Sequence, residues 1–99
     1  MPNKSEPNPM HVDTASTTVP LIPADVVTCI REIRVMGTGV GERFTLRHGA
    51  TTGDGTLVYD FISTAAKLTD TFKVPHGVAY GDGLWVTSIG GTQTAQIWR

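Results

Sequence analysis

Glycine and proline are distributed unevenly along this chain, and the division near residue 24 constrains the fold more than any motif does. Residues 1–24 contain five of the six prolines, no glycine and no aromatic residue, whereas residues 25–99 contain all eleven glycines and all seven aromatic residues. A segment so poor in large apolar side chains buries too little surface to offset the entropy lost on ordering. The sequence therefore predicts an extended N-terminal arm over residues 1–24 and one folded domain over residues 25–99.

The folded part has the pattern of short β-strands separated by glycine turns. Residues 26–36 also have helical spacing, but their β-branched side chains favour a strand. Strands are expected over 26–36, 43–48, 56–63, 68–74, 78–80, 84–89 and 93–98, with Pro75-His76-Gly77 ending the fourth. Short strands at this spacing are typical of antiparallel sandwiches and small barrels. We expect an all-β fold, a small antiparallel β-sandwich that is jelly-roll-like and carries the arm in front of it.

Charge and hydropathy exclude several classes of partner. The formal net charge is −1, and the segment 25–99 has seven basic and seven acidic residues, so no basic stripe suggests nucleic acid. The sequence contains no run of 18 apolar residues and therefore predicts no membrane span. The single cysteine, Cys29, excludes an intrachain disulfide and reads as a small buried apolar side chain.

No constellation of residues predicts catalysis, a cofactor or a metal. The glycine-rich run 37–41 lacks the spacing of a dinucleotide loop and precedes a strand, so it reads as a connection. The Gly-Asp-Gly triplets at 53–55 and 81–83 supply one carboxylate each, which favours turns over calcium sites. The histidines match no zinc spacing; they are His11, His48 and His76. We expect no enzymatic activity, no cofactor and no metal site.

Large aromatic side chains are the candidates for surface recognition. Tyr80, Trp85 and Trp98, with Tyr59, would form a sugar-binding platform if they shared one exposed face. Such residues more often occupy a core or a contact between subunits. Tyr80, Trp85 and Trp98 are therefore predicted as surface or subunit contacts.

The end of the arm holds the predicted anchor to a partner. Pro20 and Pro23 bracket Leu21 and Ile22, and two prolines so placed impose extended geometry. Leu21 and Ile22 are the only adjacent large apolar pair in the arm, and Val19 precedes them. Two places are open to this segment, an edge of the sandwich or a neighbouring molecule. We expect Val19, Leu21 and Ile22 to anchor it to a partner.

The order of strands and turns resembles a known class of proteins. The residues that carry the resemblance are 33–41, 44–49, 60–64, 83–87 and the terminal Gln96-Ile97-Trp98-Arg99. In this rhythm the chain resembles small β-sandwich virion proteins of tailed bacteriophages, which decorate capsids or serve as adaptors and fibres at the neck and tail. The arm is similar to the N-terminal extensions that such proteins lay across neighbouring subunits.

The resemblance and the arm together give the expected function. It is that of a non-enzymatic virion subunit, a capsid decoration or cement protein, located in particles assembled in the host cytoplasm. Its expected partners are the major capsid protein or another virion protein and further copies of itself, without nucleic acid or membrane. The alternatives are a neck, tail or fibre-adaptor subunit and a carbohydrate-binding sandwich. Removal of residues 1–24 is expected to leave a folded sandwich that no longer joins the particle.

Overall fold

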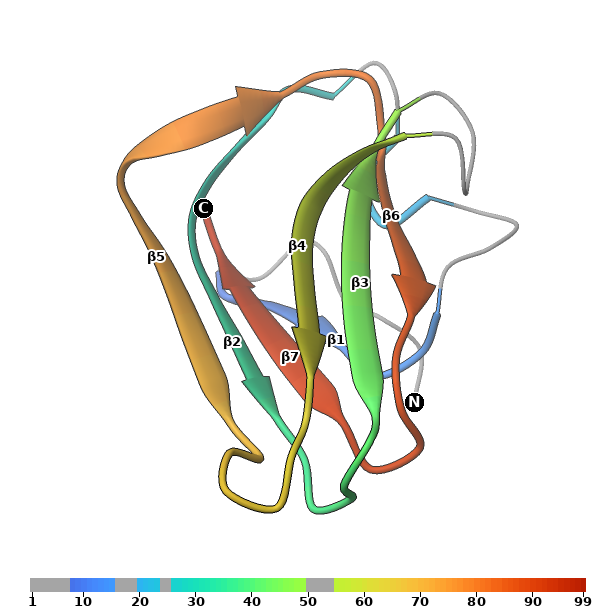
Figure 1. Cartoon of the computed structure of the whole chain (residues 1–99). Coiled ribbons are helices and arrows are strands. Elements are labelled where there is room, and N and C mark those ends of the chain that lie inside the picture. The colour runs from blue at the N-terminus through green and yellow to red at the C-terminus, as the bar shows by residue number, and fades with distance from the viewer. Residues whose placement is uncertain (1–7, 16–19, 24–25, 50–54) are drawn as a thin grey trace.

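Two antiparallel sheets face each other in this molecule (Figure 1). The computed structural model describes residues 8–15, 20–23, 26–49 and 55–99, apart from the side chains of residues 75 and 76. The regular structure of these residues consists of β-strands. The strands are β1 (Met10–Val12), β2 (Thr28–Met36), β3 (Arg43–His48), β4 (Thr56–Ile62), β5 (Asp70–Tyr80), β6 (Leu84–Ser88) and β7 (Thr94–Trp98).

The strand order is that of a jelly roll. One sheet has the order β1-β7-β2-β5, and the other has the order β4-β3-β6. A bridge between Ile22 and Leu84 adds residues 20–23 beside β6, at the free edge of the second sheet. Residues 20–23 count as the second segment, between β1 and β2, so that β7 becomes the eighth. In space, one sheet then has the order first, eighth, third, sixth, and the other has the order second, seventh, fourth, fifth. The predicted fold class is confirmed, and the sheets are called sheet A (β1-β7-β2-β5) and sheet B (β4-β3-β6) below.

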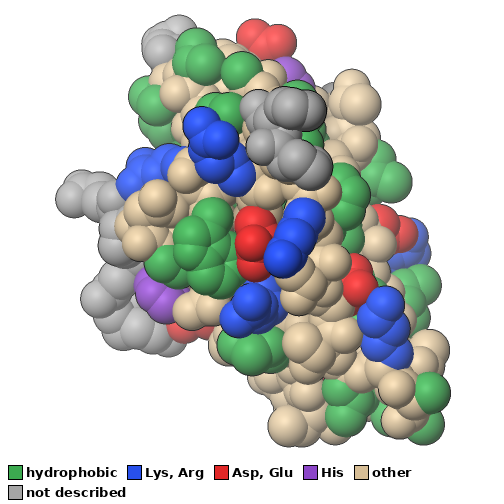
Figure 2. All heavy atoms as spheres, turned by 90° about the vertical axis from the view of Figure 1, so that its left-hand side faces the viewer, with side chains coloured by type: hydrophobic (Ala, Val, Ile, Leu, Met, Phe, Trp, Pro, Cys, Tyr) green, Lys and Arg blue, Asp and Glu red, His purple; other side chains and the backbone are tan. Residues whose placement is uncertain are grey.

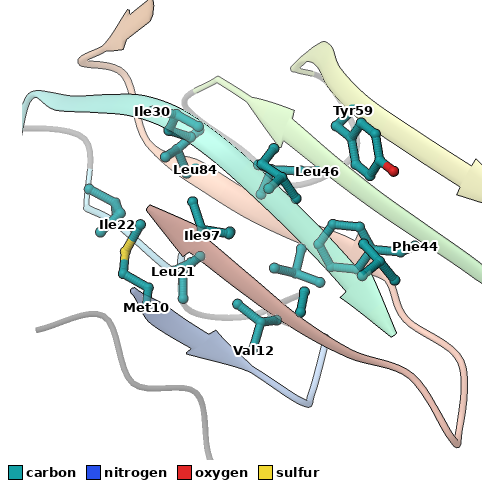
Figure 3. Packing of buried hydrophobic residues seen from close by; sticks show 14 of the residues in the cluster. Met10, Val12, Leu21, Ile22, Ile30, Phe44, Leu46, Tyr59, Leu84 and Ile97 are labelled. Atoms are coloured by element: carbon teal, nitrogen blue, oxygen red, sulfur yellow. The ribbon is translucent and has the colours of Figure 1, made fainter. Parts of the chain in front are cut away.

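Alternation of side chains along the strands builds the core between the sheets. In sheet A, Ile33 of β2 lies opposite Ile97 of β7, and both are fully buried. In sheet B, Phe44 of β3 lies opposite Phe61 of β4. The close view in Figure 3 shows these two layers meeting. The buried cluster comprises Met10, Val12, Leu21, Ile22, Ile30, Ile33, Val35, Phe44, Leu46, Tyr59, Phe61, Leu84, Val86, Ala95 and Ile97.

The N-terminal segment differs from the expected arm, because its described residues are part of the sandwich. Met10 and Val12 pair with Ile97 and Ala95 at the edge of sheet A, and both side chains are fully buried. Because side chains alternate along a strand, Met10 and Val12, with one residue between them, both face the core. Over a 24-residue window, the surrounding prolines and polar residues hide this pattern. The boundary expected near residue 24 does not separate the described residues before it from the domain.

Strand β5 is continuous where the sequence predicts an interruption. The chain was expected to end one strand at Pro75-His76-Gly77 and start another, but β5 runs through all three residues. Opposite β2 the register shifts, from Ile30 paired with Val78 to Glu32 paired with Lys73. Gly77 has a φ of 70°, and a Cβ there would lie 2.4 Å from the sulfur of Cys29. The turn residues therefore form a bulge in an edge strand, a position where proline is tolerated.

Candidate functional site

The residues predicted to anchor the arm in a partner lie inside this molecule. Leu21 and Ile22 are 7% and 4% exposed, and Figure 3 shows them beside Met10 and Ile97. The backbone N–H of Leu21 donates to the carbonyl of Leu84 at 2.7 Å, and the N–H of Leu84 donates to the carbonyl of Ile22 at 3.0 Å. Contrary to the expectation, these two side chains complete the chain's own core. Val19 lies outside the described residues.

The predicted aromatic contacts do not share a face. Trp85 on sheet B is itself buried, at 8% exposed, so it is not the surface contact that the sequence predicts; its indole N–H donates to the carbonyl of Gly49 at 2.9 Å. Tyr80, at the end of β5, packs edge-on against His48 with ring centroids 4.8 Å apart. Burial raises the pKa of Tyr80.

Trp98 is on the other sheet. Its neighbour Ile97 is buried, so Trp98 lies on the outer face of sheet A. Tyr59, the fourth aromatic of the suggested platform, belongs to the core. The idea that these four aromatic side chains form one platform is therefore wrong.

The glycine-rich run 37–41 is a structural connection held by the side chain of Thr92, from the turn between β6 and β7. The hydroxyl oxygen of Thr92 accepts hydrogen bonds from the backbone N–H groups of Thr38 and Gly39 at 3.1 and 2.9 Å. The same hydroxyl donates to Oε1 of Glu42 at 2.7 Å. The backbone amides at this turn thus already bond to the protein, in agreement with the interpretation as a connection.

The second Gly-Asp-Gly triplet forms a turn as the sequence suggests. The backbone N–H of Asp82 donates to Nε2 of His48 at 3.0 Å, and Gly83 has a φ of 101°. Asp54 of the first triplet lies outside the described residues. Among the residues that the structure describes, no three His, Cys, Asp or Glu side chains are grouped to hold a metal ion. None of the described segments is a helix long and apolar enough to cross a membrane.

The side of the sandwich between β4 and β5 is held by a small polar and aromatic cluster. The rings of Tyr59 and Phe72 stack with centroids 5.4 Å apart. The hydroxyl of Tyr59 donates to Asp70, whose carboxylate also pairs with the ammonium group of Lys67 at 2.9 Å. Burial, with the neighbouring carboxylate of Asp70, raises the pKa of Tyr59. Burial opposes ionisation of Asp70, but the bonds from Tyr59 and Lys67 outweigh it and leave the pKa of Asp70 lowered.

The same side of the molecule exposes apolar surface on its edge strands. Leu57 and Ile62 on β4 are 49% and 51% exposed, and Phe72 and Val78 on β5 are also exposed. Of the described strands, β4 pairs only with β3 and β5 pairs only with β2, so each leaves one edge without a strand. Such an edge can hydrogen bond to another chain. Proline and a bulge interrupt β5, whereas β4 contains no proline and no lysine; its register against β3 shifts by one residue at Val58.

An ion pair beside Ile62 fixes the outer face of β4. Arg43 donates to both carboxylate oxygens of Asp60, at 2.8 Å from Nε and 2.6 Å from Nη2. The hydroxyl of Thr45 donates to Asp60 at 3.0 Å. The hydrogen bond from Arg43 is the main cause that lowers the pKa of Asp60. This bidentate geometry holds the polar side chains in place along the exposed strand.

A second candidate site is an open groove on the outer face of sheet A. Its volume is about 400 Å³, within the range of small-molecule sites. The guanidinium carbon of Arg34 lies 5.4 Å from the centre of the Trp98 ring beside it. The space-filling view in Figure 2 shows basic side chains gathered around an acidic one on this part of the surface. The groove is lined by Arg31, Glu32, Lys73, Val74, Trp98 and Arg99.

Sequence reasoning identified one residue of this groove, Trp98, and missed the others. Alternation along β2 places Glu32 and Arg34 on one face, opposite the buried Ile33 and Val35. The bulge in β5 determines which residue lies opposite Glu32, and the sequence pattern did not reveal that bulge. The row of charged residues across the groove could therefore be identified only from the structure.

Comparison with protein families, with curated proteins and with solved structures finds no match to this chain. The geometry of the described residues and the resemblance in strand and turn rhythm are therefore the basis for the function proposed next.

Proposed function

We propose that this chain is a non-enzymatic structural subunit that assembles with further copies of itself through β4. The observation that carries the proposal is the exposed edge of β4 with two large apolar side chains on it, Leu57 and Ile62. Backbone groups at a sheet edge pair readily with another strand, and proteins that avoid such pairing protect the edge with proline, lysine or a bulge. β4 has no proline and no lysine, and its bulge at Val58 leaves residues 59–62 as a regular stretch.

The chemistry of β4 and of the whole chain favours a second copy as the occupant. Two copies related by a twofold axis would pair their β4 strands antiparallel, which gives the same contact on both subunits. A formal net charge of −1 gives little repulsion between copies. A small domain also gains from burying apolar side chains in an interface, because its own core is limited.

The setting that we propose is the virion of a tailed bacteriophage, with the chain as a capsid decoration or cement protein. The resemblance of residues 33–41 and of the later strand and turn segments supports this setting. The jelly-roll order agrees with it by analogy, since viral capsid proteins use this architecture and so do lectins. On a lattice with many copies, a modest contact at each subunit suffices for stable attachment.

The predicted clamp through Leu21 and Ile22 is no longer part of the proposal. Their side chains are buried in the chain's own core, and pulling them out would expose apolar surface. The docking surface is therefore assigned to β4.

Self-association is tested by sedimentation of the full chain over a range of concentrations. We expect dimers or larger species, and we expect Ile62→Lys to shift them to monomer because it places a charge on the paired edge. The matched control is Val40→Lys, which introduces the same side chain at a residue that is 64% exposed in the turn after β2. A chain that stays monomeric at millimolar concentration, or equal dissociation by both variants, contradicts the proposal.

The virion setting is tested by mass spectrometry of purified particles. Hundreds of copies per particle support decoration of the shell, and about a dozen copies support the alternative of a neck, tail or fibre-adaptor subunit. Absence of the chain from purified particles overturns the virion setting and leaves the assembly through β4 to be judged by sedimentation.

A further inference from the structure

The groove on sheet A is built from a row of residues across three strands. Glu32 of β2 lies opposite Lys73 of β5 on one side and opposite Trp98 of β7 on the other. Neighbouring strands are about 4.8 Å apart, so this row spans roughly 10 Å. Arg31 and Arg99 lie beside the row in the same groove. A carboxylate and an aromatic ring are thus brought together with three cationic side chains.

The charges in this row are only partly paired. Arg34 holds Glu32 from the side, with 3.5 Å between their charged groups, and also lies against the ring of Trp98. Arg34 therefore fixes the positions of both the carboxylate and the ring. Within the described part of the chain, neither Arg31 nor Lys73 has an acidic partner within 4.0 Å. Two cationic groups thus remain for an anion, although the chain as a whole carries a net charge of −1.

We propose that this groove binds a sugar that carries a carboxylate, such as a uronic or sialic acid unit of an acidic glycan. Arg31 and Lys73 would pair with the sugar carboxylate, since charge-assisted hydrogen bonds to carboxylates are among the strong ones. Glu32 would accept hydrogen bonds from sugar hydroxyls. The ring of Trp98 offers an apolar surface for the carbon skeleton of the sugar.

The carboxylate of Glu32 distinguishes this ligand from a nucleic acid. A phosphate backbone carries one charge per nucleotide and is bound by stretches of cations without acidic residues between them. In this row Glu32 lies between Lys73 and Trp98, where it would repel phosphates and where hydroxyl groups would find an acceptor. The short row suits one or two sugar units of a longer chain.

The binding test uses the full chain and carboxylated oligosaccharides. The probes are tetragalacturonate, a hyaluronan tetrasaccharide and sialyllactose, each titrated by calorimetry and by NMR shifts of the Trp98 indole. The neutral control is the methyl ester of tetragalacturonate, which has the same skeleton without the charge. We expect binding to at least one acidic probe and at least tenfold weaker binding to the ester, because the charge-assisted bonds are lost.

Two groove variants and one matched control place the binding site. Lys73→Gln and Trp98→Ala should each weaken binding roughly fivefold or more. Lys67→Gln removes the same charge near β5 but outside the groove and should leave binding unchanged. NMR spectra of each variant check that the fold is retained.

Three results would overturn this proposal. They are no binding to any acidic probe at millimolar concentration, equal binding of the ester, and tighter binding of single-stranded oligothymidylate than of the sugars. Since the groove lies on sheet A and β4 belongs to sheet B, any of these results leaves the sedimentation test of self-association unaffected.

Discussion

The two lateral sides of the sandwich are closed in different ways. On the side of β1 and β6, residues 20–23 lie beside β6, and Leu21 and Ile22 fill the space between the sheets. On the side of β4 and β5, Tyr59 and Phe72 stack, but Phe72 remains 39% exposed and both strands have a free edge among the described strands. The first side, called the closed side below, is completed by the chain itself. The second, called the open side, leaves apolar surface for another molecule.

This difference assigns separate tasks to the two sides. Burial of large side chains supplies most of the favourable free energy of a small domain, so the closed side contributes mainly to folding. The open side has less burial and more exposed strand edge, which suits association. If this division is correct, substitutions on the closed side should change stability more than those on the open side.

The largest effect is expected from removing residues 1–24. The truncated chain loses β1 and residues 20–23, and with them four buried core side chains: Met10, Val12, Leu21 and Ile22. Each large apolar side chain of this kind is worth about 2–5 kcal/mol, against a total stability of about 5–15 kcal/mol for a domain. We expect loss of the cooperative unfolding transition in circular dichroism. A truncated chain that unfolds cooperatively, with dispersed NMR signals, would restore the independent arm expected from the sequence.

A single substitution on the closed side is expected to have the next largest effect. Ile22→Ala should lower the free energy of unfolding by about 2–5 kcal/mol, because it leaves a cavity beside β6. The measurement is urea unfolding of the full chain. Val27→Ala is the matched control, since Val27 is 72% exposed and its truncation should cost less than about 0.5 kcal/mol. Similar losses for the two variants would mean that residues 20–23 do not hold the closed side together.

The strands of sheet B were predictable because apolar and polar residues alternate along most of their sequence, although the register between β3 and β4 shifts at Val58. Residues 43–48 were expected as a strand and are β3, and the expected strand 56–63 is β4 with one residue fewer. Residues 93–98 were expected as a strand, and in β7 Ala95 and Ile97 are buried while Gln96 and Trp98 lie on the other face. In β3, in β7 and in residues 59–62 of β4, the largest buried side chains follow this two-residue period, whereas Leu57, beyond the register shift, is exposed.

The closed side was not predictable in the same way, because its signal is short and lies in a proline-rich segment. Met10 and Val12 give one repeat of the strand period, and Leu21 and Ile22 lie between prolines that suggest an extended arm. The contact of Leu21 and Ile22 with Leu84 joins residues far apart in the sequence. Composition and the local period of side chains do not predict such a contact. The bulge in β5 was missed for a related reason: Pro75 and Gly77 are turn residues locally, but β2 continues to pair on both sides of them.

On the open side, Phe72→Ala should cost less than the change at Ile22. Part of the Phe72 side chain already contacts water, so less apolar surface is lost from burial. The stacking with Tyr59 adds about 0.5–1.5 kcal/mol, and we expect a total loss of about 1–2 kcal/mol in urea unfolding. A loss equal to that of Ile22→Ala would show that both sides contribute alike to folding.

The smallest effect is expected from Asp70, whose carboxylate bonds to Tyr59 and Lys67 on the open side. The pKa of Asp70 is lowered in the folded chain, so folding favours its ionised form. Its contribution to stability is fully present above the unfolded value of about 3.9 and is lost as the pH falls through the lower folded value. Because Lys67 is largely exposed, we expect Asp70→Asn to cost less than about 1 kcal/mol at pH 7.

The pH dependence separates this contribution from a simple change of packing. The difference in stability between the original chain and Asp70→Asn should shrink as the pH falls below about 4, because protonation removes the charge from Asp70 itself. Tyr59→Phe should reduce the same acid dependence in part, since it removes one hydrogen bond that favours the carboxylate. Urea unfolding at several pH values measures both effects. A difference that is constant from pH 7 to pH 2 would show that the charge of Asp70 does not stabilise the open side.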